Sequence, residues 1–180
     1  MNKGQKAAII IDLADELLER GSWCGETHIQ KAVFLLQEVL RLDSGFEFIL
    51  YKHGPFSFEL RDQLIEMTAD GLLEYVVRHP GYGPTLVPTA EKYEFNSRFP
   101  KTLTRHKERL QFVADFIGNR GVVDLERLAT AIYVTARLGT AREQRASVLV
   151  ELKPHISIAE AEKACAEADV FSSKGQELSR

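Results

Sequence analysis

The sequence lacks the markers of several large protein classes. Its 180 residues include only two cysteines, Cys24 and Cys165, which lie far apart and form no CxxC pattern. We therefore expect reduced thiols rather than a disulfide framework. No uninterrupted apolar run approaches the ~20 residues that a membrane-spanning helix needs. Because residues 1–6 are also polar and unlike a secretory signal, the sequence predicts a cytoplasmic protein without a membrane segment.

Motifs for nucleotide, metal or nucleophilic chemistry are also missing. No GxxxxGKS or GxxxxGKT loop occurs. Cys24 and His28 lie close together, with Glu26 between them, but two such side chains do not complete a zinc site. His53 has no nucleophile and no orienting partner at a recognisable spacing. We expect that the protein is not an enzyme and needs neither a metal nor an organic cofactor.

The charge is unevenly divided along the chain. Residues 1–100 hold 10 Lys and Arg residues against 15 Asp and Glu residues, a net charge of −5, and residues 101–180 hold 13 against 11, a net charge of +2. A dedicated DNA-binding domain usually shows a basic face. The acidic first half therefore argues against DNA as its main partner.

The order of elements in the first half is typical of a winged helix. Apolar residues recur at helical spacing over 5–20 and again after Thr27 and Gln30, which have the spacing of a capping box. The alternating FEFILY at 46–51 predicts a short strand. A helix from Ser57 to Gly71 and a hairpin around HPGYGP at 79–84 complete the pattern.

The second half is predicted to be helical throughout. The fold class is therefore mainly α with a small β-hairpin. We expect a winged-helix-like domain over 1–98 and a helical extension packed on it over 99–171. Residues 172–180, SSKGQELSR, have few apolar side chains and are expected to be disordered.

The stretch LYKHGPFSFEL at 50–60 holds the candidate binding residues. Pro55 keeps Gly54 out of helical geometry, so the chain must turn there. Ser57 is placed to cap the helix that follows. Amphipathic aromatic side chains beside a turn are suited to contact a partner protein, so we select Tyr51 and Phe56 together with the neighbouring His53 as candidate partner-binding residues.

A basic run begins the second half and gives a candidate nucleic-acid contact. Basic side chains can neutralise phosphates, although on an amphipathic helix they more often form its solvated face. The residues of this run are Lys101, Arg105, Lys107 and Arg109.

Two segments resemble a known family. IQKAVFLLQEVL at 29–40 and LYKHGPFSFELRDQLIEMTADGLLE at 50–74 resemble the Panacea-type (SocA-like) antitoxin domain and related winged-helix proteins of bacteria. There, a helix with K-L-x-x-L-Q character precedes Y-x-x-G-P, a second helix and G-L-I. The resemblance covers roughly residues 5–90 and implies a non-enzymatic protein that binds a partner protein, such as a toxin, by direct contact. The matching positions are Gln30, Lys31, Leu35, Leu36, Gln37, Tyr51, Gly54, Pro55, Leu60, Leu64, Gly71 and Leu72.

Three functions stay open, and we rank a protein-binding regulator or antitoxin above a winged-helix transcription regulator and an enzyme. The helix at the DNA-recognition position bears four carboxylates and a single Arg61, so phosphates would be repelled there and DNA binding should be weak. The partner protein, homo-oligomerisation and the pathway also stay open. The four carboxylates are those of Glu59, Asp62, Glu66 and Asp70.

Overall fold

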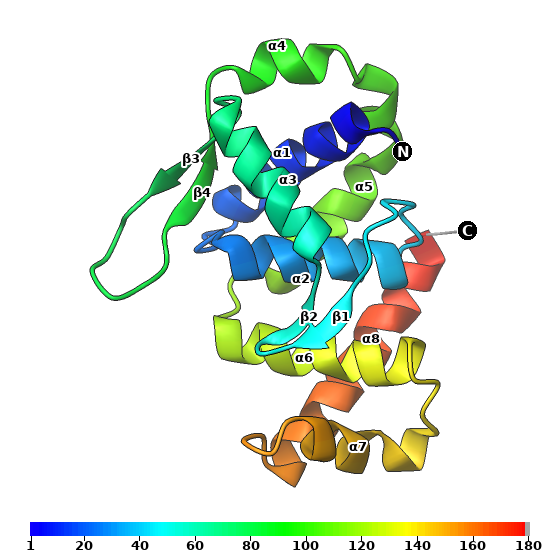
Figure 1. The fold of residues 1–180 in the computed structure, drawn as a ribbon. Coiled ribbons are helices and arrows are strands. Elements are labelled where there is room, and N and C mark those ends of the chain that lie inside the picture. Colours follow the sequence, from blue (N-terminus) through cyan, green and yellow to red (C-terminus); the bar gives the residue numbers. More distant parts are fainter. Residues whose placement is uncertain (179–180) are drawn as a thin grey trace.

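The protein is mainly helical with little β-structure, as the sequence predicts, but it carries two small antiparallel hairpins where one was expected (Figure 1). The computed structural model describes residues 1–178. No helix in this range combines the length and the apolar character needed to cross a membrane. The elements are α1 (Lys3–Glu19), α2 (Glu26–Glu38), β1 (Ile49–Tyr51), β2 (Gly54–Phe56), α3 (Phe58–Ala69), β3 (Leu73–Val76), β4 (Thr85–Pro88), α4 (Lys92–Ser97), α5 (Pro100–Ile117), α6 (Val122–Ala136), the 3-10 turn η1 (Arg142–Gln144), α7 (Arg145–Leu152) and α8 (Ile158–Leu178).

Helix α2 forms the centre of the molecule. Every residue from His28 to Leu36 is buried, because α1, α5, α6 and β2 pack around the helix. Figure 1 shows α2 and α6 running side by side through the middle of the fold. A helix buried on all sides has no solvated face, so its polar residues must find partners inside the protein. Buried side chains from both predicted parts, 1–98 and 99–171, share one core.

The second helix begins earlier than the sequence predicts, and Gln30 does not take part in a capping box. Gly25 is the N-cap, and no side chain caps the helix. The Gln30 amide instead donates to the Ser57 carbonyl and accepts from the Ser57 N–H, both at 2.9 Å. Buried backbone groups need hydrogen bonds, and Gln30 provides both for Ser57. Ser57 itself caps α3 as predicted, since its hydroxyl accepts from Leu60 N–H.

The strand predicted over 46–51 is shorter, and the turn after it contains a second strand. The Gln37 side chain binds both backbone groups of Phe46, which leaves that residue no strand partner. Only Ile49–Tyr51 is extended, and it pairs with Gly54–Phe56 so that Ile49 lies opposite Phe56. The prediction for residues 46–48 was therefore wrong. The later hairpin, β3 with β4, is confirmed.

The prediction of a disordered tail is wrong over 172–178, because α8 continues to Leu178. Phe171 is fully buried, with its ring 5.1 Å from that of Phe112 and 4.8 Å from that of Phe116. One turn later, a Cβ added to Gly175 would lie 2.9 Å from side-chain atoms of Val39 and Leu40, just after α2. The helix therefore extends because it packs closely on the core. Residues 179 and 180 lie outside the described residues.

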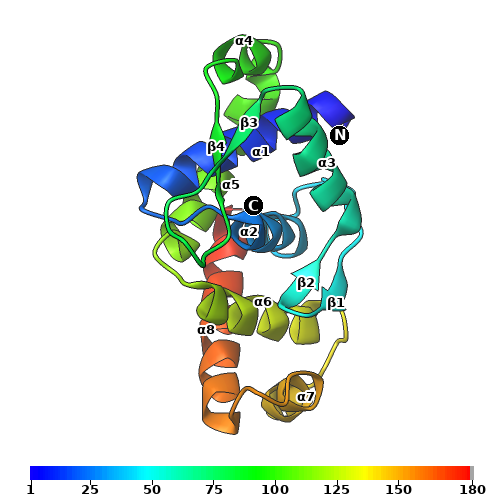
Figure 2. The ribbon, with the colours of Figure 1, turned by 60° about the vertical axis from the view of Figure 1, so that its left-hand side comes forward.

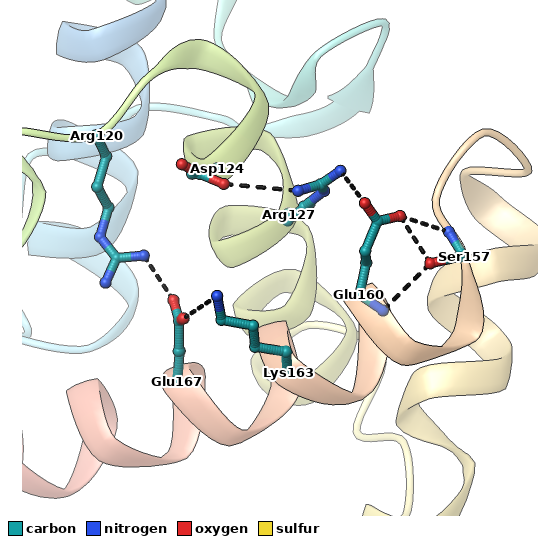
Figure 3. Close-up of polar contacts among 7 residues, drawn as sticks. All are labelled: Arg120, Asp124, Arg127, Ser157, Glu160, Lys163 and Glu167. Atoms are coloured by element: carbon teal, nitrogen blue, oxygen red, sulfur yellow. Dashed lines mark hydrogen bonds and ion pairs between the residues drawn. The ribbon is translucent and has the colours of Figure 1, made fainter.

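Ion pairs join α8 to α6 and to the segment just before α6 (Figure 3). Arg127 pairs with Glu160, and Arg120 pairs with Glu167. Glu160 also accepts from the Ser157 N–H and hydroxyl, which lowers the pKa of its carboxyl group. Ser157 in turn accepts from the Glu160 N–H, so this pair forms a capping box at the start of α8. These contacts fix α6, which supports the first hairpin.

Candidate protein-binding surface

The first hairpin and the start of α3 place three aromatic rings together at the surface. The ring of Tyr51 lies 5.5 Å from that of Phe56 and 5.6 Å from that of Phe58, and Phe56 and Phe58 are 5.2 Å apart. Tyr51 is 52% exposed and Phe58 is 42% exposed, whereas Phe56 is half-buried. We call these three residues the aromatic surface. Two of the three predicted partner-binding residues, Tyr51 and Phe56, thus meet, and Phe58 joins them.

Apolar and acidic side chains continue this surface. Ile49 on β1 and Ile65 on α3 are about half exposed. The Arg61 guanidinium lies 5.1 Å from the centre of the Phe58 ring, within cation–π range. An apolar centre with a polar rim is the usual anatomy of a protein interface. The predicted carboxylates of α3 and its C-cap are all exposed: Glu59, Asp62, Glu66 and Asp70.

Two buried lysines hold the turn that carries this surface. Lys31 of α2 donates to the Pro55 carbonyl at 2.9 Å. Lys153, just after α7, donates to the carbonyls of Tyr51 and Lys52 at 2.7 and 2.6 Å. Both lysine residues are more than 90% buried. The hairpin is therefore fixed through its backbone carbonyls, which leaves the Tyr51 ring free to face solvent.

Glu126 of α6 supplies the opposite charge for this arrangement. It is 5% exposed, and its carboxylate lies 3.2 Å from the Lys153 ammonium. His155 and His53 approach the same carboxylate at 3.3 and 3.9 Å. Burial lowers the pKa of Lys31 to about 8, and the Glu126 charge acts in the opposite direction. We call Lys31, Glu126 and Lys153 the hairpin anchor.

His53 lies beside the aromatic surface, but its contacts do not form a nucleophile–base arrangement. Its side chain is 53% exposed and faces the Glu126 carboxylate. The only nearby hydroxyl that the sequence suggests, that of Ser57, is buried and caps α3. A general base needs a nucleophile within hydrogen-bond reach, and Ser57 is occupied elsewhere. His53 therefore belongs to the rim of the turn.

The predicted nucleic-acid residues do not all share one side of α5. Lys101, Arg105 and Arg109 are spaced four residues apart, so they follow one face of the helix. Lys107 lies about 200° around the helix from Arg105. It faces Asp12 of α1, whose pKa is raised by burial and lowered in part by the Lys107 charge. At most three of the four cations can therefore meet one phosphate backbone.

Cys24 and His28 have the surroundings of residues that stabilise the fold. Burial raises the pKa of the Cys24 thiol to about 12, so it stays protonated at neutral pH and is a poor nucleophile. One ring nitrogen of His28, Nε2, bonds the Arg120 carbonyl at 3.2 Å. Within residues 1–178, no cluster of three or more His, Cys, Asp and Glu side chains is placed to hold a metal ion.

Comparison with known proteins adds no assignment. No family model matches the chain, and no curated protein matches it. The resemblance to Panacea-type domains therefore stays a prediction that depends on the two segments quoted above.

The buried Lys31 should make stability depend on pH. The free energy of unfolding of a Cys24→Ser variant should rise by about 1–2 kcal/mol between roughly pH 8 and pH 9.5. In this range the folded protein loses the Lys31 proton, since its pKa is about 8, whereas unfolded lysine keeps it until ~10.4. The unfolded state then holds more protons, so a rising pH favours folding.

Cys24 is replaced in this experiment because its titration has the opposite sign. The folded protein keeps the thiol proton to about pH 12, whereas the unfolded chain releases it at ~8.5. Urea unfolding at several pH values gives the measurement. Adding Lys31→Met to the Cys24→Ser variant should abolish the rise, and a rise that persists there would assign it to another group.

Proposed function

We propose that this chain is a non-enzymatic, antitoxin-like regulator that binds one partner protein through the aromatic surface. The observation that supports this function is a cluster of aromatic rings at the surface, beside a hairpin whose backbone is held by two buried lysines. Exposed aromatic side chains on a rigid support lose little conformational freedom on binding, and Tyr is frequent at binding hot spots. The resemblance to Panacea-type domains points to the same function.

The charges around the aromatic surface indicate the chemistry of the partner. Glu59, Asp62 and Glu66 are exposed on α3 beside the rings. Two of these carboxylates have a cation close by: Arg61 lies over Phe58 and 3.6 Å from Asp62, and Lys3 pairs with Glu66 at 2.6 Å. An acidic rim around an apolar centre complements a partner with an apolar patch surrounded by Lys and Arg. We propose a partner with that basic rim.

DNA is the weaker alternative for the same helix. The exposed side of α3 carries carboxylates that would stand beside phosphates. We expect duplex DNA to bind with a Kd of ~10⁻⁴ to 10⁻⁶ M at physiological salt, or more weakly. Any residual binding should depend on Arg105 and fall steeply with added salt. Sequence-specific binding at ~10⁻⁸ M in a titration against the upstream region of its own gene would instead support a transcription regulator.

Substitution of the aromatic surface should weaken binding to the partner by about tenfold or more. The variant is Tyr51→Ala with Phe58→Ala, two exposed positions whose replacement removes apolar area without opening the core. The matched control is Tyr93→Ala with Val170→Ala, which are exposed on α4 and α8. The protein captured from the host by the wild-type chain is purified, and its affinity for each variant is measured by calorimetry.

The charge of the partner is tested in the same assay. Asp62→Lys should slow association and reduce its dependence on salt, because rim charges act mainly on the encounter rate. Equal losses in the control variant, or full affinity in the aromatic variant, would contradict the proposed surface.

A further inference from the structure

A second site lies where the β3–β4 hairpin meets the starts of α2 and α6. A cavity of about 360 Å³ opens there, which is within the range of small-molecule pockets. Figure 1 shows the hairpin projecting on the side of the molecule where both helices begin, and Figure 2 turns this side forward. None of its lining residues belongs to the aromatic surface. The residues used below are Trp23, Glu26, His28, Tyr75 and Tyr82.

Three aromatic residues line this pocket. The rings of Trp23 and Tyr82 are 5.4 Å apart and tilted by 46°. Tyr75 reaches the same cavity from β3 and is 47% exposed. Trp23 also donates its indole N–H to the Gly83 carbonyl at 2.7 Å, which ties the hairpin tip to the pocket. The aromatic lining is therefore held together by a contact between distant segments.

Two side-chain atoms of the pocket wall are hydrogen-bond acceptors that no donor of the protein reaches, Glu26 Oε1 and His28 Nδ1. Glu26 Oε1 is buried and has no hydrogen-bond partner, and within residues 1–178 no ion pair involves Glu26. His28 is 3% exposed. Its Nε2 must donate to the Arg120 carbonyl, so in the neutral ring Nδ1 carries a lone pair, and this atom also has no partner. Buried acceptors of this kind favour a ligand that brings N–H groups.

The charges in the pocket wall decide whether a cationic or an anionic ligand is favoured. α2 and α6 begin at Gly25 and Gly121 without side-chain caps, which leaves N–H groups that favour anions. Glu26 occupies the first turn of α2 and would repel an anion. The faces of aromatic rings also attract cations. Both the carboxylate and the rings therefore select positive charge.

We propose that this pocket binds a small organic ammonium ion with an apolar body, held by the rings of Trp23, Tyr75 and Tyr82 and by the Glu26 carboxylate. The N–H groups of the ligand supply the donors that Glu26 lacks, and its apolar body fills the cavity beside Pro84. This site is independent of the proposed protein-binding surface.

The single tryptophan of the chain gives a direct readout, since Trp23 is in the pocket wall. The probes are cyclohexylmethylammonium, the neutral cyclohexylmethanol and the anionic cyclohexanecarboxylate, none of which has an aromatic ring. In a fluorescence titration, the ammonium ion should bind at least about tenfold more tightly than either of the others. Saturation-transfer NMR on each probe gives a second measurement that does not depend on fluorescence.

Substitutions of pocket residues test whether the ammonium ion binds in this pocket. Glu26→Gln and Tyr82→Leu should each lower the affinity for the ammonium ion by about tenfold. The matched controls, Glu151→Gln on α7 and Tyr93→Leu on α4, replace exposed residues outside the pocket and should leave its affinity unchanged. The proposal is overturned if the alcohol or the carboxylate binds as tightly as the ammonium ion. It is also overturned if neither method detects the ammonium ion up to its solubility limit.

Discussion

Glu126→Gln should lower the free energy of unfolding by about 3–5 kcal/mol at pH 7. The substitution keeps the size of the side chain but removes the negative charge between the two lysines of the hairpin anchor. Lys153 would then be a buried cation without a counter-ion, and Lys31 would lose the stronger of the two negative charges that act on it, those of Glu126 and Glu26. Uncompensated buried charges are costly. Denaturant unfolding of the purified variant gives the value.

A surface ion pair on the same helix gives the control. Asp124 lies 3.6 Å from Arg127, but its side chain is 59% exposed. Asp124→Asn should therefore cost about 0–1 kcal/mol. If both variants lose the same free energy of unfolding, the burial of the Glu126 charge does not contribute to stability and the prediction is wrong. The triple variant Lys31→Met, Glu126→Leu, Lys153→Met should recover much of the loss, because apolar side chains of similar size often replace buried charges at little cost.

The hairpin anchor also connects stability with the proposed function. The Glu126 variant should open the turn before the rest of the fold, since Lys153 bonds two of its carbonyls. Hydrogen exchange should therefore increase first in residues 49–56. Partner affinity should fall in the same variant even though Tyr51 and Phe58 are unchanged.

Local signals in the sequence predicted most of the helices and both turns. Pro55 after Gly54 marked the first turn, and Ser57 marked the start of α3, because each acts through its own backbone or that of a near neighbour. The hairpin around 79–84 was predicted from its glycines and prolines in the same way. The aromatic surface could be predicted in part, since Tyr51 and Phe56 flank the turn.

Contacts between distant segments could not be predicted. Lys31 stands in an apolar stripe, and its partner Pro55 lies 24 residues away, while Lys153 bonds Tyr51 across 102 residues. A lysine in such a stripe was the one available signal of a buried ammonium group. Gln30 was assigned to a cap because its spacing fits, yet its side chain binds Ser57. The tail was misjudged because Phe171 packs on α5, and no local pattern shows that contact.

The pocket also depends on contacts between distant segments, so the sequence does not predict it. Trp23 and Tyr82 are separated by most of the first half of the chain, and they meet because β4 bonds the segment before α2 through Leu86 N–H and the Cys24 carbonyl at 2.9 Å. In the sequence, Cys24, Glu26 and His28 suggest only an incomplete metal site. In the structure Cys24 is buried in the core, whereas Glu26 and His28 line a pocket with aromatic rings from distant segments, which the local sequence does not reveal.

Gly54→Ala should destabilise the protein by about 2–4 kcal/mol, from backbone strain and from crowding together. Gly54 has a φ of +83°, a conformation that side chains with a Cβ rarely adopt. An added Cβ would also lie 3.1 Å from Thr130 Oγ1 and 3.4 Å from the Glu126 carbonyl. Denaturant unfolding measures the total loss.

Gly81→Ala separates the strain from the crowding. Gly81 has a similar φ of +94°, but no atom lies within 4 Å of the position of an added Cβ. This control should therefore show only the strain, about 1–2 kcal/mol.

A double-mutant cycle then tests the crowding directly. Thr130→Ala removes the Oγ1 atom nearest to the added Cβ, so Gly54→Ala should cost less in that background than in the wild type. An unchanged cost would mean that the hairpin can move away from α6. The anchor would then not hold the turn rigidly, and the aromatic surface would lose the fixed support on which the proposed binding depends.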